Sequence, residues 1–222
     1  MESNYDQSFI VGCYFLFLVL SPAHAKPTLI VSPITPAPNV PMLTTEPISP
    51  LGEIATCNDL QNIQNYLAGN YVLINDIDCS GIIFSPIGSS AYSPFTGNLD
   101  GQGYSIKNLT VQTSQITQVP AGLFGYVNGG TISNLHIVAA KVIPPVSTSS
   151  FPSSGNDNAG ILAGDIMFGA SVNNVTVQGT VTTGNTVGGL VGTNWDGTIF
   201  RSSADVVVQG PVAGGLVGYN AG

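Results

Sequence analysis

The sequence predicts an all-β solenoid, a fold in which short strands of successive repeats stack on one another. The main observation is a short glycine-containing string that recurs at Pro120–Val127, Asn158–Gly164, Val187–Asn194 and Ala213–Asn220. Measured between matching glycines, successive copies are 38, 29 and 26 residues apart, and the longest interval contains an insertion at Pro144–Asp157. Repeats of this length with two strand-like runs each are typical of solenoids.

A second pattern follows the recurring string. The segments Ser105–Val111, Thr131–Ile137 and Ser171–Val177 each place apolar residues at positions x, x+3 and x+5. The step of two is strand alternation, whereas the step of three requires an extra residue at which the chain turns a corner.

Asparagine stands at this corner in all three segments, as Asn108, Asn134 and Asn174. Asparagine tolerates the left-handed backbone region better than most residues. We therefore expect the three side chains to stack as one asparagine ladder. Arg201 takes the same place in the last copy, where we expect a weaker repeat or a shifted register.

The composition supports this fold and excludes some partners. Only 7% of the 222 residues are charged, and 27 are glycine, which fits a glycine-punctuated β protein better than a helical enzyme. The net charge of −8 arises from 4 basic and 12 acidic residues. With so few cations, neither nucleic acid nor an anionic membrane surface is an expected partner.

The N-terminus predicts export. An apolar run at Phe9–Leu20 precedes Ala23-His24-Ala25, a small-residue cleavage site, so residues 1–25 are expected to be a signal peptide. The run is too short to span a bilayer, although the first eight residues lack the usual Lys or Arg. Residues 26–53 are rich in proline and predict a semi-rigid linker, so we expect no membrane span in the mature chain.

A short helix is expected where the folded region begins, near Ile54. Leu60, Ile63 and Leu67 fall on one helical face within Thr56–Leu67, and a strand is predicted at Tyr71–Asp78. A helix in this place would cap the open end of the stack. Cys57 and Cys79 flank this region, and in a secreted protein they are expected to form a disulfide; in a cytosolic protein they would be two buried thiols.

The repeated glycine pairs carry a family resemblance. Gly122–Gly125, Gly189–Gly192 and Gly215–Gly218 resemble the GLUG repeat, which occurs in large secreted bacterial adhesins and beside some IgA-cleaving peptidases. The resemblance implies that residues 54–222 form a right-handed parallel β-helix in a secreted or cell-surface protein. No His-Glu-x-x-His peptidase motif is present.

Three carboxylates are the candidates for chemistry. Asp76, Asp78 and Asp100 could share one outer face, where they could bind calcium or act as acid and base on a polysaccharide. We favour the alternative that they are solvated or cap turns, and expect no cofactor, catalytic residue or metal site. Trp195 at a turn could stack on a sugar, but packing over the glycines is the favoured interpretation.

Two functions are consistent with these observations. The favoured one is a non-enzymatic exported module, an adhesin or passenger-type surface protein, with a protein or glycan as its ligand. The alternative is a small carbohydrate-active β-helix that uses surface carboxylates. The sequence stops within a repeat at Gly222, so we expect a truncated array whose open C-terminal end takes further repeats or another copy.

The signal-peptide interpretation makes the first prediction. Protein secreted into the medium should begin at Lys26, because cleavage follows Ala25. N-terminal sequencing of the secreted chain measures this directly, and a secreted chain that begins at Met1 would contradict it.

Overall fold

The computed structural model describes residues 52–113, 119–143, 157–182 and 184–222. The predicted signal peptide, nearly all of the predicted linker and most of the Pro144–Asp157 insertion lie outside these ranges. The described residues belong to one compact unit. None of their helices is long and apolar enough to cross a membrane.

The described chain is mostly β-strand, which confirms the all-β class. Its helical elements are α1 (Cys57–Asn62) and the 3-10 helix η1 (Ile63–Asn65). Its strands are β1 (Gly52–Ile54), β2 (Asn70–Leu73), β3 (Ile77–Asp78), β4 (Ile83–Phe84), β5 (Asn98–Asp100), β6 (Ser105–Lys107), β7 (Thr110–Gln112), β8 (Phe124–Asn128), β9 (Thr131–Ile143), β10 (Asn158–Ala159), β11 (Ala163–Met167), β12 (Ser171–Thr182), β13 (Thr186–Gly188), β14 (Val191–Trp195), β15 (Thr198–Phe200), β16 (Ser203–Gln209), β17 (Val212–Gly214) and β18 (Val217–Asn220).

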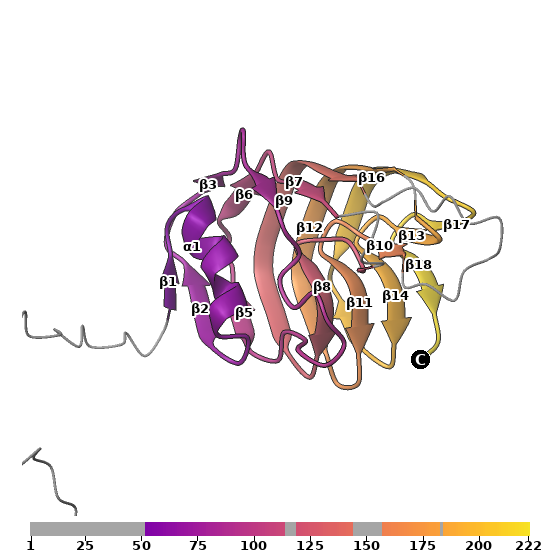
Figure 1. Cartoon of the computed structure of the whole chain (residues 1–222), viewed down its shortest axis with the longest axis horizontal. Helices are drawn as coiled ribbons and strands as arrows, with labels where there is room; N and C mark the ends of the chain where they lie inside the picture. Colours follow the sequence, from indigo (N-terminus) through magenta and orange to yellow (C-terminus); the bar gives the residue numbers. More distant parts are fainter. Residues whose placement is uncertain (1–51, 114–118, 144–156, 183) are drawn as a thin grey trace, which may run out of the picture. The chain divides into compact units, whose positions relative to one another are not determined.

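These strands form three curved parallel sheets. The largest runs in the order β1-β2-β5-β9-β12-β15, with β3, β4, β6, β7 and β16 attached to it. The second sheet is β10-β13-β17 and the third is β8-β11-β14-β18. Figure 1 shows the strands as successive layers, from indigo at β1 to yellow at β18. Each layer therefore hydrogen-bonds to layers made by earlier and later repeats.

The recurring glycine string keeps its register between layers. Val187 pairs with Ala213, and Val191 pairs with Val217, in both cases 26 residues apart. The x, x+3, x+5 pattern is also confirmed between β9 and β12, where Val172 pairs with Ile132. The last repeat holds the same register, because Ala204 of β16 pairs with Val177. The expected shift at Arg201 does not occur.

One alignment was wrong. Ser105–Val111 does not lie on Thr131–Ile137: Ile106 pairs with Ile137, and Leu99 pairs instead with Ile132. The long strand β9 explains the error, because it carries the apolar pattern twice. Ile132, Leu135 and Ile137 form one x, x+3, x+5 set, and Ile137, Ala140 and Val142 form another, all of them buried. The spacing alone could not distinguish the first corner of β9 from the second.

The core is made by stacked apolar side chains. Leu135, Val172 and Val175 are fully buried, and so are Phe95 and Phe124, whose ring centroids lie 4.6 Å apart. Side chains in a parallel stack meet their equivalents in neighbouring layers, so the interior is a set of continuous apolar columns. Removing one member leaves a cavity between two rigid neighbours.

The predicted cap is present, but it is shorter than expected. Thr56 caps α1 by accepting the backbone N–H of Asp59, while the Asp59 carboxylate accepts the backbone N–H of Thr56, which completes a capping box. The helix passes into η1 and ends before Leu67. Leu60 and Ile63 are buried in the core, as the helical pattern predicted.

The strand predicted at Tyr71–Asp78 is interrupted, giving β2 and β3. A bend at Asn75 separates them, and its side-chain amide donates to the Ala55 carbonyl 3.0 Å away. The ordered strands also include residues before Ile54, because Gly52 and Glu53 belong to β1, which pairs with β2.

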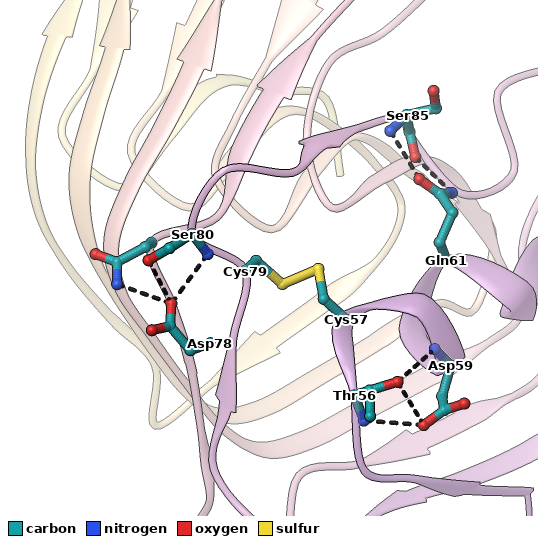
Figure 2. Close-up of a disulfide and its surroundings, with 9 residues drawn as sticks. Thr56, Cys57, Asp59, Gln61, Asp78, Cys79, Ser80 and Ser85 are labelled. Atoms are coloured by element: carbon teal, nitrogen blue, oxygen red, sulfur yellow. Dashed lines mark hydrogen bonds between the residues drawn. A yellow bond between two sulfur atoms is a disulfide. The ribbon is translucent and has the colours of Figure 1, made fainter.

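Side-chain amides of the cap form hydrogen bonds with backbone groups at the N-terminal end of the stack, in place of a neighbouring strand. Gln61 accepts from the Ser85 N–H at 2.9 Å and donates to the Ser85 carbonyl at 3.1 Å, and Gln64 accepts from the Gly88 N–H at 2.8 Å. The predicted disulfide joins Cys57 at the start of α1 to Cys79, with the Cα atoms 5.3 Å apart (Figure 2). The N-terminal end of the stack is thus covered by a covalently attached helix.

Candidate functional site

Two columns of corners run along the large sheet. In the first column, Asn134 and Asn174 have φ values of 52° and 56°, the left-handed conformation predicted for them. The Asn174 amide donates to Asn134 Oδ1 at 2.9 Å, and the Asn134 amide donates to Asp100 Oδ1 at 3.0 Å. Arg201 continues the column with a φ of 50° but adds no amide to the ladder.

Asn108 belongs to the second column. It also adopts the left-handed conformation, with φ at 56°, but its backbone N–H donates to the Val138 carbonyl, and its neighbour in the next layer is Ala139, at the same φ. Its side-chain amide donates to Asp78 Oδ1 at 2.9 Å. The prediction of a single ladder through Asn108, Asn134 and Asn174 was therefore wrong. The error arose because β9 carries the apolar pattern twice and Asn108 aligns with its second corner.

The three candidate carboxylates are all engaged at these corners. Asp78 Oδ1 accepts from the Ser80 hydroxyl at 2.7 Å and the Ser80 N–H at 3.0 Å (Figure 2). The same oxygen accepts from the Asn108 amide. These bonds, chiefly the one from the Ser80 hydroxyl, lower the pKa of Asp78. Asp100 Oδ1 accepts from the Gln102 N–H at 2.9 Å as well as from Asn134. Asp78 and Asp100 each cap a turn and accept a hydrogen bond from an asparagine side-chain amide of the next layer.

Asp76 makes the one ion pair recorded among the described residues. Its carboxylate accepts from Lys107 Nζ at 2.7 Å and from the Ser105 N–H at 2.9 Å, and the Lys107 bond is the main reason that its pKa is lowered. Both side chains are about half exposed, so the pair contributes little to stability. In the described part of the chain, no three His, Cys, Asp or Glu residues are grouped closely enough to hold a metal ion.

Two further asparagine ladders were missed from the sequence. The Asn194 amide donates to Asn220 Oδ1 at 2.7 Å, and the Asn98 amide donates to Asn70 Oδ1 at 2.6 Å. Asn194 also bonds both the N–H and the carbonyl of Gly197, which closes the turn after β14. The signal for the first pair was available, because Asn194 and Asn220 end the two most similar copies of the recurring string.

Trp195 lies at the end of β14 and is 44% exposed. Its ring contacts the ring of Tyr219 in β18, with centroids 5.7 Å apart and planes at 57°. Tyr219 is itself 49% exposed. The pair is an apolar surface feature that can contact a ligand.

Asp165 is the most unusual ionisable group. It lies in β11 between Tyr126 of β8 and Thr193 of β14, and it is buried. Burial raises its pKa to about 6, against the opposing effect of hydrogen bonds from Asn158, at 2.7 Å, and Thr193. No pattern in the sequence identified Asp165 as a buried residue, because a lone aspartate between alanine, glycine and isoleucine resembles an ordinary turn residue.

Comparisons with known proteins support the fold more than any particular function. No protein-family model matches the chain. The chain is 35% identical to halomucin from Haloquadratum walsbyi over an alignment of 170 residues, and the match covers 70% of this chain and 2% of halomucin. A crystal structure from Bacteroides ovatus, described provisionally as an immunoglobulin A1 protease, matches with a TM-score of 0.54 and 19% identity. That match covers 77% of this chain and 53% of the other.

The first corner column predicts a charge-sensitive position. Asn134→Asp removes the amide donor to Asp100 and places a second carboxylate beside it, so we expect the free energy of unfolding at pH 7 to fall by about 1–3 kcal/mol. The loss should shrink at acid pH, where the new carboxyl is protonated. Urea denaturation at several pH values measures it. Thr131→Asp is the matched control, and an equal loss in that variant would show that the ladder has no special role.

Burial of Asp165 predicts a pH dependence of stability. Its folded pKa lies above its ordinary value of 3.8, so the folded state binds the proton more tightly. The stabilising contribution of protonated Asp165 is complete below about pH 4 and is lost as the pH rises through 6. The free energy of unfolding falls by about 3 kcal/mol in total over this range. Asp165→Asn should therefore be more stable than the parent at pH 8 and similar at pH 4. Thermal melts of both proteins test this, and parallel pH profiles would contradict it.

Proposed function

We propose that this chain is an exported, non-enzymatic right-handed parallel β-helix of the GLUG-repeat type, acting as an adhesin or passenger-type module outside the cell or at its surface. The parallel, in-register layers and the likeness to the Bacteroides structure support the β-helix. The right hand is the one that crossovers between parallel strands take in nearly all proteins.

The observation that carries the non-enzymatic assignment is the use of Asp76, Asp78 and Asp100. Asp78 and Asp100 accept hydrogen bonds from turn N–H groups and from asparagines of the next layer, and the Asp76 carboxylate is engaged by Lys107 and the Ser105 N–H. The lowered pKa of Asp76 and Asp78 opposes a role as general acid, since such an acid must hold its proton near neutral pH. The arrangement therefore favours a scaffold over a polysaccharide-cleaving site.

An extracellular location is supported by the covalent chemistry of the cap. A disulfide between Cys57 and Cys79 is typical of proteins that fold in an oxidising compartment. The similarity to halomucin and the apolar run before Ala25 point the same way. We propose a protein or glycan ligand and assign its first contact to the exposed pair Trp195 and Tyr219.

The test uses the mature secreted chain against a panel of surface polysaccharides and matrix proteins. We expect saturable binding to at least one of them, weakened by Trp195→Ala, and no new reducing ends or unsaturated sugar products. Asp100→Asn is the matched variant, because its amide oxygen can still accept from Gln102 and Asn134. Cleavage products that disappear in this variant would show that the chain is a carbohydrate-active enzyme instead.

A further inference from the structure

Two corners of the large sheet carry an acceptor sequence for a sugar. Asn108–Thr110 reads Asn-Leu-Thr and Asn174–Thr176 reads Asn-Val-Thr. In an exported protein, a segment of the form Asn-x-Ser or Asn-x-Thr can receive an oligosaccharide on the asparagine amide. No other asparagine in the 222-residue sequence is followed by serine or threonine at this spacing. Both acceptor sequences therefore coincide with corners whose surroundings the structure shows.

Both acceptor asparagines lie on the outside of the stack. A regular strand turns one of two consecutive residues inward, but at these corners Lys107 and Asn108 are both exposed, and so are Asn173 and Asn174. The left-handed backbone of Asn108 and Asn174, with φ at 56° in each, produces this arrangement. The side chain that would carry the sugar is thus open to solvent in the folded protein.

The hydrogen bonds at both amides are compatible with a substituent on the nitrogen. An asparagine amide has two N–H groups. The Asn108 amide donates one hydrogen bond, to Asp78 Oδ1 at 2.9 Å, and the Asn174 amide donates one, to Asn134 Oδ1 at 2.9 Å. Attachment of a sugar replaces one N–H group and retains the other. Each corner can therefore keep its contact with the neighbouring layer when it is modified.

An exposed apolar side chain borders each acceptor site. Ile83 is 65% exposed and pairs with Thr110, whereas Phe200 is 53% exposed and pairs with Asn173. Layers of a parallel stack are about 4.8 Å apart, so the first sugar at either asparagine can reach one of these side chains. Only 7% of the residues are charged, and attached sugars would add hydrated surface to a chain that has few charges to supply it.

We propose that Asn108 and Asn174 are sites of Asn-linked glycosylation, an inference that rests on the export proposed above. The donor is an oligosaccharide joined to a lipid through phosphate. The asparagine Nδ2 forms a bond to the anomeric carbon of the first sugar and loses a proton, while the bond from that carbon to the phosphate oxygen breaks. The lipid phosphate leaves with the bonding electron pair. Transfer takes place on the unfolded chain during export, and folding then places both sugars at the corners.

The experiment expresses the full chain, with its own N-terminus, in a secreting host that contains an Asn-linked oligosaccharyltransferase. Protein from the medium is treated with a glycan-releasing amidase in heavy-oxygen water, which converts each modified asparagine into labelled aspartate. Peptide mass spectrometry should find the label at Asn108 and Asn174. Asn134 is the internal control, because it has the same corner conformation but is followed by His136 in place of threonine, and it should carry no label.

Four variants separate the acceptor sequence from the fold. Thr110→Val and Thr176→Val remove the hydroxyl that the acceptor sequence requires but keep both asparagines and a β-branched side chain, so each should remove one glycan and one step in electrophoretic mobility. Thr110→Ser and Thr176→Ser should retain both glycans. Thr176→Ser also retains the hydroxyl that lies 2.6 Å from His136 Nδ1, so the pair of variants at this position controls for that contact.

Four outcomes overturn the proposal. A secreted chain with no label at either asparagine would show that the corners are not acceptors, while leaving export intact. Label at one asparagine alone would remove the assignment of the other. Label at Asn134, or label that persists at both sites in the valine variants, would show that modification does not follow the acceptor sequence. A chain retained unmodified inside the cells would contradict export and glycosylation together.

Discussion

Backbone hydrogen bonding between successive layers is the constraint on which the rest of the structure depends. Strands of one layer pair only with strands of other layers, for example β12 with β9 on one side and β15 and β16 on the other. Corners of one column must therefore align between layers, and where β12 lacks a counterpart of Ala139 in β9 the register shifts by one residue between Val177 and Gly179. Left-handed residues at Asn134, Asn174 and Arg201 keep one such column in line.

The polar side chains at the corners follow from this constraint. A sharp corner leaves backbone groups without strand partners, and short carboxylate and amide side chains satisfy them. Asp78 and Asp100 accept from the turn that follows them and from an asparagine one layer away. Asp78 and Asp100, two of the three candidate catalytic residues, are thus residues that the corners require, which directs the search for function toward the exposed aromatic pair Trp195 and Tyr219.

Sequence reasoning could predict what repeats regularly. The glycine strings, the disulfide and the capping helix were predicted because each has a local pattern, and Val191 and Val217 pair at the spacing read from the sequence. Asn108 was misplaced because β9 carries the same apolar spacing at both of its corners. Asp165 could not be found at all, since its burial depends on β8 and β14 lying on either side of it.

The most direct test of this account is the register between β6 and β9, measured by nuclear Overhauser effects between backbone protons of isotope-labelled protein. The structure predicts contacts between Ile106 and Ile137 and between Leu99 and Ile132. Contacts between Ile106 and Ile132 would instead restore the alignment of Ser105–Val111 with Thr131–Ile137 and a single ladder of three asparagines. That result would contradict the layer pairing from which the corners and the core have been derived.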